Sequence, residues 1–458
     1  MSATAFTSPD PATRTMHRRA VEAVNWGIPA VNYDRMYQAA VSAGADFNQI
    51  IYWAGPADWK NQTLTPNPDV VYVLPFINTK IVGPVVLEIP PADEGSITGS
   101  MMDCWQSPLE DAGPAGADEG KGGKYLFLPP GSSFAAPNGY IALPSSYYQN
   151  YALLRSIFKS GSEADVAGAV AYARRIKLYP LSRAGKPLVT KFVDVIDRVF
   201  DSTIPYDVRF FESLDRMVQV EPWSTRDKVM IDMLKSIGIE RGKEFTPDAT
   251  TKSILKDAAG EAQAWFDLRF ETSFPPYYRG RQWIAAAPPD AMETLGTLFE
   301  KREGYAVDAR ALVSHWAFAA SKHPRRGWFH LSTMRDKEGR FLDGGKDYRL
   351  SMPANVPATQ YWSAVVYDRA SYALIRGVSR PSRSCQSPDL WTNLDHSVDI
   401  FFGPEAPKGW ESNWIPTRAG GHFVICIHFY GPEKPLFERT WKLPDVEEVA
   451  AAQIELAA

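Results

Sequence analysis

The chain has 458 residues, enough for two or three domains with sizeable hydrophobic cores. Its 45% hydrophobic and 22% charged residues are ordinary for a soluble globular protein. A net charge of −4 gives no basic surface for nucleic acid, and three cysteines are too few for a disulfide framework.

The N-terminal region predicts a helix rather than a signal sequence. Residues 1–20 lack the apolar core of a secretory signal, and no apolar run approaches the length of a membrane span. With so few cysteines, this predicts a soluble, cytoplasmic protein without a membrane partner. Helical spacing of apolar residues follows, interrupted near Gly27 and Pro29. We therefore expect an N-terminal helical segment over residues 1–50.

The remaining chain changes its hydrophobic period twice. Short runs with period two, such as GPVVLEIP and GKYLFLPPG, predict a first β domain over residues 51–195. Helical spacing, as in STRDKVMIDMLKSIGI, predicts a helical linking segment over residues 196–325. Period-two runs return in ATQYWSAVVYD, and they predict a second β domain over residues 326–458.

Two stretches of the first β domain carry candidate site residues. In TPNPDVVY, Asn67 and Asp69 precede a strand that contains Tyr72, so they either satisfy local backbone donors or face a ligand. In SMMDCW, strand alternation places Asp103 on the same face as Trp105.

A carboxylate at Asp103 is expected to be buried, and it needs a donor, a cation or a raised pKa. We expect the donor to come from another segment, such as Arg155. Both a structural anchor and a general acid or base remain open for this carboxylate.

The stretch GGHFVICIHFY predicts a strand with two different faces. Its apolar core face consists of Phe423, Ile425, Ile427 and Phe429. The opposite face carries His422 and His428 roughly 20 Å apart, too far to share a metal ion. Cys426 lies roughly 7 Å from His428, so these two could bind a metal with ligands from elsewhere, or Cys426 is a small buried apolar residue. We expect His422 at a solvated sheet end and His428 to be functional. The alternative is that His428 bonds a neighbouring carbonyl on a packed surface.

Motifs of standard enzyme chemistry are missing from the sequence. There is no GxSxG, no HExxH and no paired CxxC, and the glycine-rich GPAGADEGKGGK lacks the GK[ST] ending of a phosphate loop. We therefore expect no organic cofactor, while a bound metal ion stays open.

Several stretches resemble a known pair of domains. TPNPDVVYV, GPVVLEIP and MMDCWQSP resemble the domain of unknown function 1254, and SVDIFFGPEAPKGWESNWIPT and FYGPEKPLFERTWKLPDVE resemble its companion, the domain of unknown function 1214. The resemblance covers about residues 20–450. It implies a β-rich α+β fold with two antiparallel β-sandwich, jelly-roll-like domains, N-terminal helices and a helical segment between the domains.

The resemblance also implies site residues in both domains. In the first domain they are Asn67, Asp69, Tyr72, Asp103 and Trp105, and in the second they are Asp343, Gly344, Trp362, Tyr367, Asp368, Asn413, Trp414, Tyr430 and Trp441. Two positions depart from the pattern, because His396 stands in place of a glycine and His428 in place of an arginine. The loss of that arginine weakens the case for carboxylate binding, and the histidine adds a group that transfers protons near neutral pH.

These observations predict an enzyme that acts on a small polar or aromatic molecule between the two β domains. Asp103 and His428 would be its acid/base pair, and hydrolysis or hydration/elimination needs no organic cofactor. The expected binding residues are Asn67, Asp69, Tyr72, Trp105, Asn413, Trp414 and Tyr430. The alternative is a non-catalytic protein that binds a carbohydrate or another small ligand. Whether the protein forms a homo-oligomer is left open by the sequence.

Overall fold

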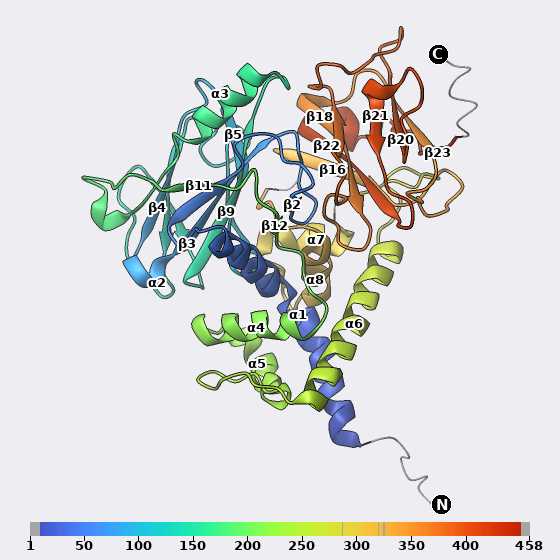
Figure 1. Cartoon of the computed structure of the whole chain (residues 1–458). Coiled ribbons are helices and arrows are strands. Elements are labelled where there is room, and N and C mark those ends of the chain that lie inside the picture. Colours follow the sequence, from blue (N-terminus) through green and yellow to red (C-terminus); the bar gives the residue numbers. More distant parts are fainter. Residues whose placement is uncertain (1–9, 286, 319, 324–325, 450–458) are drawn as a thin grey trace, which may run out of the picture.

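The computed structural model describes residues 10–285, 287–318, 320–323 and 326–449 (Figure 1). The fold is mixed α+β, with 29% helix and 27% strand, so the chain is less β-rich than its sequence predicts. Two groups of sheets lie side by side, and most helices gather below them (Figure 1). No helix in these ranges has the length and apolar content that a membrane span requires.

The N-terminal helix α1 is longer and more continuous than expected. It spans Pro11–Ser42 and contains Pro29, so the predicted interruption is wrong. Gly27 explains part of this result: a Cβ atom there would lie 2.8 Å from Cδ1 of Leu214, which belongs to α4 (Val208–Val220). Close packing of the two helices therefore offsets the loss of the backbone hydrogen bond that Pro29 cannot donate.

The first sheet pair consists of a six-stranded and a four-stranded sheet that share one hydrophobic core. The six-stranded sheet has the order β11 (Phe192–Asp194), β1 (Gln49–Tyr52), β3 (Val71–Asn78), β9 (Gln149–Ile157), β5 (Ser96–Asp103) and β6 (Pro108–Ala112). The four-stranded sheet has the order β10 (Lys177–Pro180), β4 (Val85–Ile89), β7 (Gly123–Leu128) and β8 (Tyr140–Pro144). Most neighbours are antiparallel, as predicted, but β1 pairs with β11 and β7 pairs with β8 in parallel.

The second sheet pair consists of a five-stranded and a four-stranded sheet. The five-stranded sheet has the order β13 (Ile284–Ala285), β16 (Trp328–Thr333), β22 (Phe423–Pro432), β18 (Ala358–Asp368) and β19 (Ser382–Ser384). The four-stranded sheet has the order β21 (Trp414–Pro416), β20 (Val398–Gly403), β17 (Tyr348–Met352) and β23 (Glu447–Glu448). The predicted apolar face of β22 is confirmed, because its four residues lie in the core between these sheets.

Both faces of β22 are buried. On the side away from its own core, Val424 and Tyr430 join a large core together with α1, β3 and the helices α6 (Ala249–Thr272) and α8 (Val307–Trp316). The five-stranded sheet therefore packs against the first sheet pair and the helices, and this contact makes one body of the two halves.

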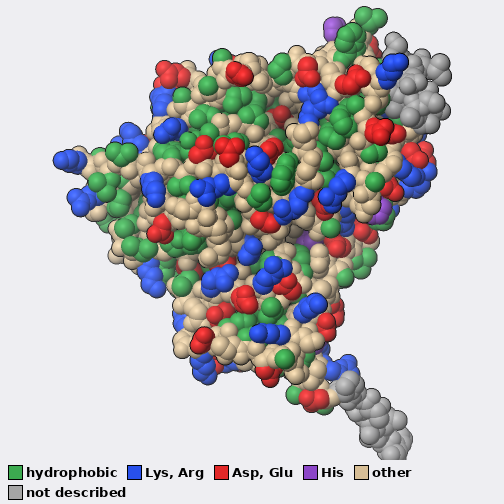
Figure 2. All heavy atoms as spheres, viewed as in Figure 1, with side chains coloured by type: hydrophobic (Ala, Val, Ile, Leu, Met, Phe, Trp, Pro, Cys, Tyr) green, Lys and Arg blue, Asp and Glu red, His purple; other side chains and the backbone are tan. Residues whose placement is uncertain are grey.

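The remaining elements are short. They are α2 (Thr79–Val82), α3 (Glu163–Ala173), α5 (Lys228–Leu234), α7 (Pro289–Thr294), α9 (Lys434–Phe437), β2 (Asn61–Gln62), β12 (Phe200–Asp201), β14 (Glu300–Lys301) and β15 (Gly304–Tyr305), with single 3-10 turns at Leu181–Arg183, Thr225–Asp227, Lys235–Ile237, Leu295–Thr297 and Glu411–Asn413. On the face shown in Figure 2, acidic and basic side chains are interspersed, as the small net charge leads us to expect.

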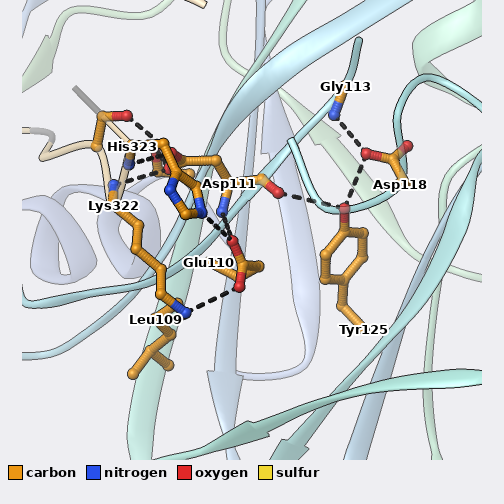
Figure 3. Close-up of polar contacts among 10 residues, drawn as sticks. Leu109, Glu110, Asp111, Gly113, Asp118, Tyr125, Lys322 and His323 are labelled. Atoms are coloured by element: carbon orange, nitrogen blue, oxygen red, sulfur yellow. Dashed lines mark hydrogen bonds and ion pairs between the residues drawn. The ribbon is translucent and has the colours of Figure 1, made fainter. Parts of the chain in front are cut away.

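A carboxylate on β6 holds the connector that follows α8. Asp111 accepts hydrogen bonds from the backbone N–H groups of Lys322 and His323 at 3.0 and 2.7 Å, and from the hydroxyl groups of Ser321 and Ser100 (Figure 3). The neighbouring Glu110 binds the side chains of Lys322 and His323 at 2.8 and 3.1 Å. These contacts fix the start of the second half to the edge of the first.

Asp111→Ala should lower the free energy of unfolding by on the order of 2–4 kcal/mol, because it leaves backbone N–H groups of the connector without an acceptor. Denaturant titration measures this loss. Asp197→Ala is the matched control, since the side chain of Asp197 is 93% exposed, and it should change the free energy by less than about 0.5 kcal/mol. Equal effects of the two substitutions would contradict the role of Asp111.

Candidate functional site

A cavity lies where the first sheet pair, the helices and the second sheet pair meet. It holds about 990 Å³ of space that atoms do not fill, its opening to solvent included. Its apolar wall includes Met36, Leu74, Leu153, Trp316 and Phe318. A mostly apolar lining with a few polar groups is typical of a site for a small organic molecule.

The polar wall of the cavity contains a buried arginine. Arg155 lies on β9 directly opposite Tyr72 of β3, and only 5% of its surface is exposed. Its guanidinium carbon lies 5.5 Å from the ring centre of Tyr72 and 5.4 Å from that of Trp328. Burial opposes the charge, but the nearby hydroxyl groups of Tyr430 and Tyr72 raise the pKa of Arg155 above its ordinary value. The cavity therefore has a permanent cation in its wall.

Two histidines and a tyrosine form a hydrogen-bonded chain that ends at the cavity. His330 of β16 and His428 of β22 are direct cross-strand neighbours, and Nε2 of His330 lies 2.9 Å from Nδ1 of His428. The hydroxyl group of Tyr367 donates to the carbonyl of Pro66 and lies 2.9 Å from Nε2 of His428.

The direction of this chain follows from its last member. Because Tyr367 donates its only hydroxyl proton to the carbonyl of Pro66, its oxygen must accept from Nε2–H of His428. Nδ1 of His428 must then accept from Nε2–H of His330. This leaves Nδ1 of His330 as an acceptor, on a residue that lines the cavity.

Both imidazoles are neutral at neutral pH. Burial, followed by the charge of Arg155, lowers the pKa of His428 to about 3. Burial, His428 and Arg155 together lower the pKa of His330 well below its ordinary value. The charge of Arg155 thus suppresses protonation of the histidine chain.

One group of side chains in the described ranges could hold a metal ion. The ligand atoms of His330, Cys426 and His428 lie within 4.8 Å of one another, and zinc accepts such a donor set. Without a metal ion, burial raises the pKa of the Cys426 thiol to about 12, whereas a bound cation would stabilise the thiolate. The two histidine nitrogens are already bonded to each other. The predicted closeness of Cys426 to His428 is confirmed, and the contacts favour a hydrogen-bonded pair over a metal site.

The structure brings together several predicted binding residues behind Tyr72. The backbone N–H of Asn67 donates to the Tyr72 hydroxyl at 2.8 Å, and the Asn67 amide donates to the Tyr361 hydroxyl at 3.1 Å. Tyr430 stacks on Tyr361 with ring centres 4.5 Å apart. Of these residues, Tyr72 lines the cavity, whereas Asn67 and Tyr430 support it from behind.

Asp69 faces the second sheet pair instead of the cavity. Its carboxylate accepts from the Ser384 hydroxyl of β19 at 3.4 Å, and burial of this carboxyl group raises its pKa to about 6. Asp69 therefore contributes to the contact between the two halves.

Asp103 is buried as predicted, with 4% of its surface exposed, but its expected partner is wrong. The carboxylate accepts from the backbone N–H groups of Trp105 and Ser107 at 2.9 and 3.0 Å, so it closes a local turn. Burial raises its pKa to about 6, an effect that these two bonds oppose. Asp103 is a turn anchor.

Asp103 does not share a site with His428. It lies opposite Asn150 of β9, five residues before Arg155, which corresponds to roughly 17 Å along the strand. The carboxylate of Asp103 is held by backbone N–H groups of its own turn, and His428 is held by His330 and Tyr367. These bonds do not bring the predicted acid/base pair together.

Three further expected binding residues lie away from the cavity. Trp105 packs 4.6 Å from the ring centre of Trp26 in the helical core. The Asn413 amide donates to the carbonyl of Trp391, and the indole of Trp414 donates to the carbonyl of Gly403. Each anchors a backbone segment, and none of the three lines the cavity.

The two remaining histidines of the C-terminal stretch lie at the surface. His422 is exposed and contacts the carbonyl of Leu342 at 3.1 Å, which confirms its predicted position at a sheet end. His396 is exposed and has a φ of 65°, the left-handed conformation that favours glycine. Backbone geometry therefore explains the glycine that the resemblance implies at this position.

Sequence reasoning missed His330 and assigned Arg155 to the wrong partner. A period-two pattern in GWFHLST places Trp328, His330 and Ser332 on one face of a strand, and this signal was available. The pairing of β16 with β22, which makes His330 a neighbour of His428, was not available because it joins segments about a hundred residues apart.

Two family models match the chain, and both describe proteins of unknown function. DUF1254 matches residues 47–180 and DUF1214 matches residues 329–434, which confirms the resemblance. No curated protein matches the chain.

A solved structure shows similarity of fold. The crystal structure of the VPA0106 protein from Vibrio parahaemolyticus is 17% identical with a TM-score of 0.58, over 95% of this chain and 100% of that one. An uncharacterized protein from Burkholderia cenocepacia is 10% identical with a TM-score of 0.45, over 96% of each chain.

His428→Gln should flatten the pH dependence of stability in acid. The pKa of His428 is lowered from 6.5 to about 3 on folding. Between these two pH values the native state binds fewer protons than the unfolded state, so stability falls as pH drops below 6.5. Between pH 7 and pH 4 the variant should lose about 3 kcal/mol less than the wild type. Denaturant titration at both pH values measures this, and the exposed His422→Gln should keep the wild-type profile.

Asp103→Asn should act in the opposite direction. The pKa of Asp103 is raised from 3.8 to about 6 on folding, so its contribution to stability is complete below 3.8 and is lost as pH rises through 6. From pH 4 to pH 7, the stability of the variant should improve relative to the wild type by on the order of 2–3 kcal/mol. A constant difference over this range would show that the carboxyl group ionises freely.

Proposed function

We propose a function that rests on the cavity, for a chain that pairs a DUF1254 region with a DUF1214 region, both of unknown function. The protein is an enzyme that acts on a small polar or aromatic organic molecule by acid/base chemistry. The reaction is a hydrolysis or a hydration/elimination, and it uses no organic cofactor.

The observation that carries this proposal is the ordered chain of Tyr367, His428 and His330. Tyr367 and His428 fix the tautomer of His330, so that its Nδ1 accepts a proton at the cavity. His330 therefore takes the role that the sequence led us to give to Asp103. His428 is a positioning residue, because it acts on a ligand through His330.

Tyr72, which also lines the cavity, supports the same function. Its oxygen accepts from the backbone N–H of Asn67, which leaves the phenol proton available to a ligand oxygen. Hydration, elimination and hydrolysis all require a proton acceptor and a proton donor in one site.

The same proposal includes a finer architecture. The shared core of each sheet pair supports two β-sandwich, jelly-roll-like domains. Residues 1–50, 51–195, 196–325 and 326–458 would be the helical segment, the first sandwich, the helical linking segment and the second sandwich. The protein would act in the cytoplasm, and a homo-oligomer is compatible with these features.

One observation favours the alternative, a non-catalytic protein for a carbohydrate or another small ligand. Burial and neighbouring groups keep the pKa of His330 far below neutral, and a weakly basic imidazole removes protons slowly. In such a protein the neutral histidines would only accept hydrogen bonds from a ligand.

Unbiased metabolite profiling with the purified protein tests the proposal. The wild type should deplete at least one metabolite beyond its own molar amount while a product appears. His330→Asn should slow this depletion by at least about 100-fold, since it removes the proton acceptor. His422→Asn, an exposed histidine elsewhere on the molecule, is the matched control and should retain the full rate.

Two other results would contradict parts of this proposal. Depletion that stops at one molecule per protein, with the metabolite recovered intact after denaturation, would establish the binding alternative. Equal depletion by the wild type and His330→Asn would remove His330 from the reaction.

A further inference from the structure

We propose that the cavity takes an organic carboxylate with a largely apolar body, and that the carboxylate pairs with Arg155. This assignment rests on the proposed function in its use of the cavity and adds the class of substrate. It follows from the charge of Arg155, from its lack of an internal counterion and from the lining around it.

Arg155 is a buried cation without a carboxylate partner among the described residues. Burial opposes its charge, and Tyr430 and Tyr72 favour it, Tyr72 also through a side-chain hydrogen bond. Its Nε atom has no hydrogen-bond partner within the described ranges. Arg383 is about equally buried, yet its guanidinium binds both oxygens of Asp389 at 3.0 and 2.8 Å. A buried guanidinium without a counterion is costly, so a partner from outside the chain explains why it is present.

The charge of the cavity selects a monoanion. Of the described residues that line it, Arg155 alone carries a full charge. One guanidinium balances one carboxylate and can bind it with two parallel hydrogen bonds. A phosphate monoester carries nearly two negative charges at neutral pH and would need a second cation.

The rest of the lining describes the body of the molecule. Leucine, methionine and aromatic side chains make up most of the wall and favour apolar groups. Two buried polar groups in the wall lack partners within the described part of the chain: the amide of Asn61 and the indole N–H of Trp316. They can meet one further hydroxyl or carbonyl oxygen of the ligand.

A bound carboxylate would also change the histidine chain. The charge of Arg155 disfavours a proton on His330 and His428, and a carboxylate at Arg155 would offset that charge. The substrate would thus raise the basicity of the residue that accepts its proton.

Calorimetric titration of the full chain tests this class of ligand, with 3-phenylpropanoate, its primary amide and phenyl phosphate as probes. The carboxylate should bind at least about 30-fold more tightly than the neutral amide of the same shape, because only the carboxylate pairs with the guanidinium. Phenyl phosphate should bind more weakly than the carboxylate. Equal affinity for acid and amide, tighter binding of phenyl phosphate or no detectable binding of the carboxylate would each overturn the assignment.

Substitutions of Arg155 complete the test. Arg155→Gln and Arg155→Met should remove the preference for acid over amide. Arg175→Gln should keep it, because the half-buried Arg175 pairs with Asp93 and does not line the cavity. Both Arg155 variants should melt at or above the wild-type temperature, because they remove a buried charge that lacks an internal partner. A large fall in melting temperature would identify Arg155 as a structural residue and overturn the proposal.

Failure of this assignment is distinguishable from failure of the proposed function. His330→Asn should retain the preference for carboxylate over amide, because Arg155 stays in place. If the protein binds carboxylates through Arg155 but converts no metabolite, the enzymatic proposal fails and this assignment stands. If it converts only neutral metabolites at a rate that depends on His330, this assignment fails and the enzymatic proposal stands.

Discussion

Burial of strand β22 on both faces is the constraint on which the rest of this structure depends. One face fills the core of the second sheet pair, and the other packs on α1, β3 and the first half of the chain. Polar groups on a doubly buried strand must find partners inside the protein. His428 meets this requirement with His330 on one side and Tyr367 on the other. The ordered histidine chain is thus a consequence of how the two halves join.

Strand patterns in the sequence predicted this strand and its apolar face, but not what covers the other face. Alternation assigns Phe423 and His428 to opposite sides because it is a local property. Which strand lies beside His428 depends on pairing with β16, about a hundred residues earlier in the chain. Asn67, Tyr72 and Tyr430 were likewise candidates from the sequence, but only the fold shows that they meet.

The wrong expectations have a common physical cause. Asp103 was judged a buried carboxylate in need of a distant donor, and two backbone groups of its own turn satisfy it instead. Asn413 was expected to bind a ligand, and its amide instead bonds a backbone carbonyl. The break expected at Pro29 fails because packing of α1 outweighs local propensity. Residue type and spacing show that a polar group needs a partner, whereas the fold decides which partner it finds. The similarity to the VPA0106 protein, at 17% identity, accordingly concerns the fold alone.

Arg155 and the histidine chain are linked through charge. Burial is the largest cause that keeps His330 and His428 neutral, and the charge of Arg155 adds to it. An anion paired with the guanidinium would offset only this added part, so the same charge would act on both recognition and proton transfer. Tyr72 is the cross-strand neighbour of Arg155. Its hydroxyl is already oriented by the backbone N–H of Asn67. The two halves of the chain therefore contribute different parts of one site: the first supplies the cation and the oriented phenol, and the second supplies the ordered imidazoles.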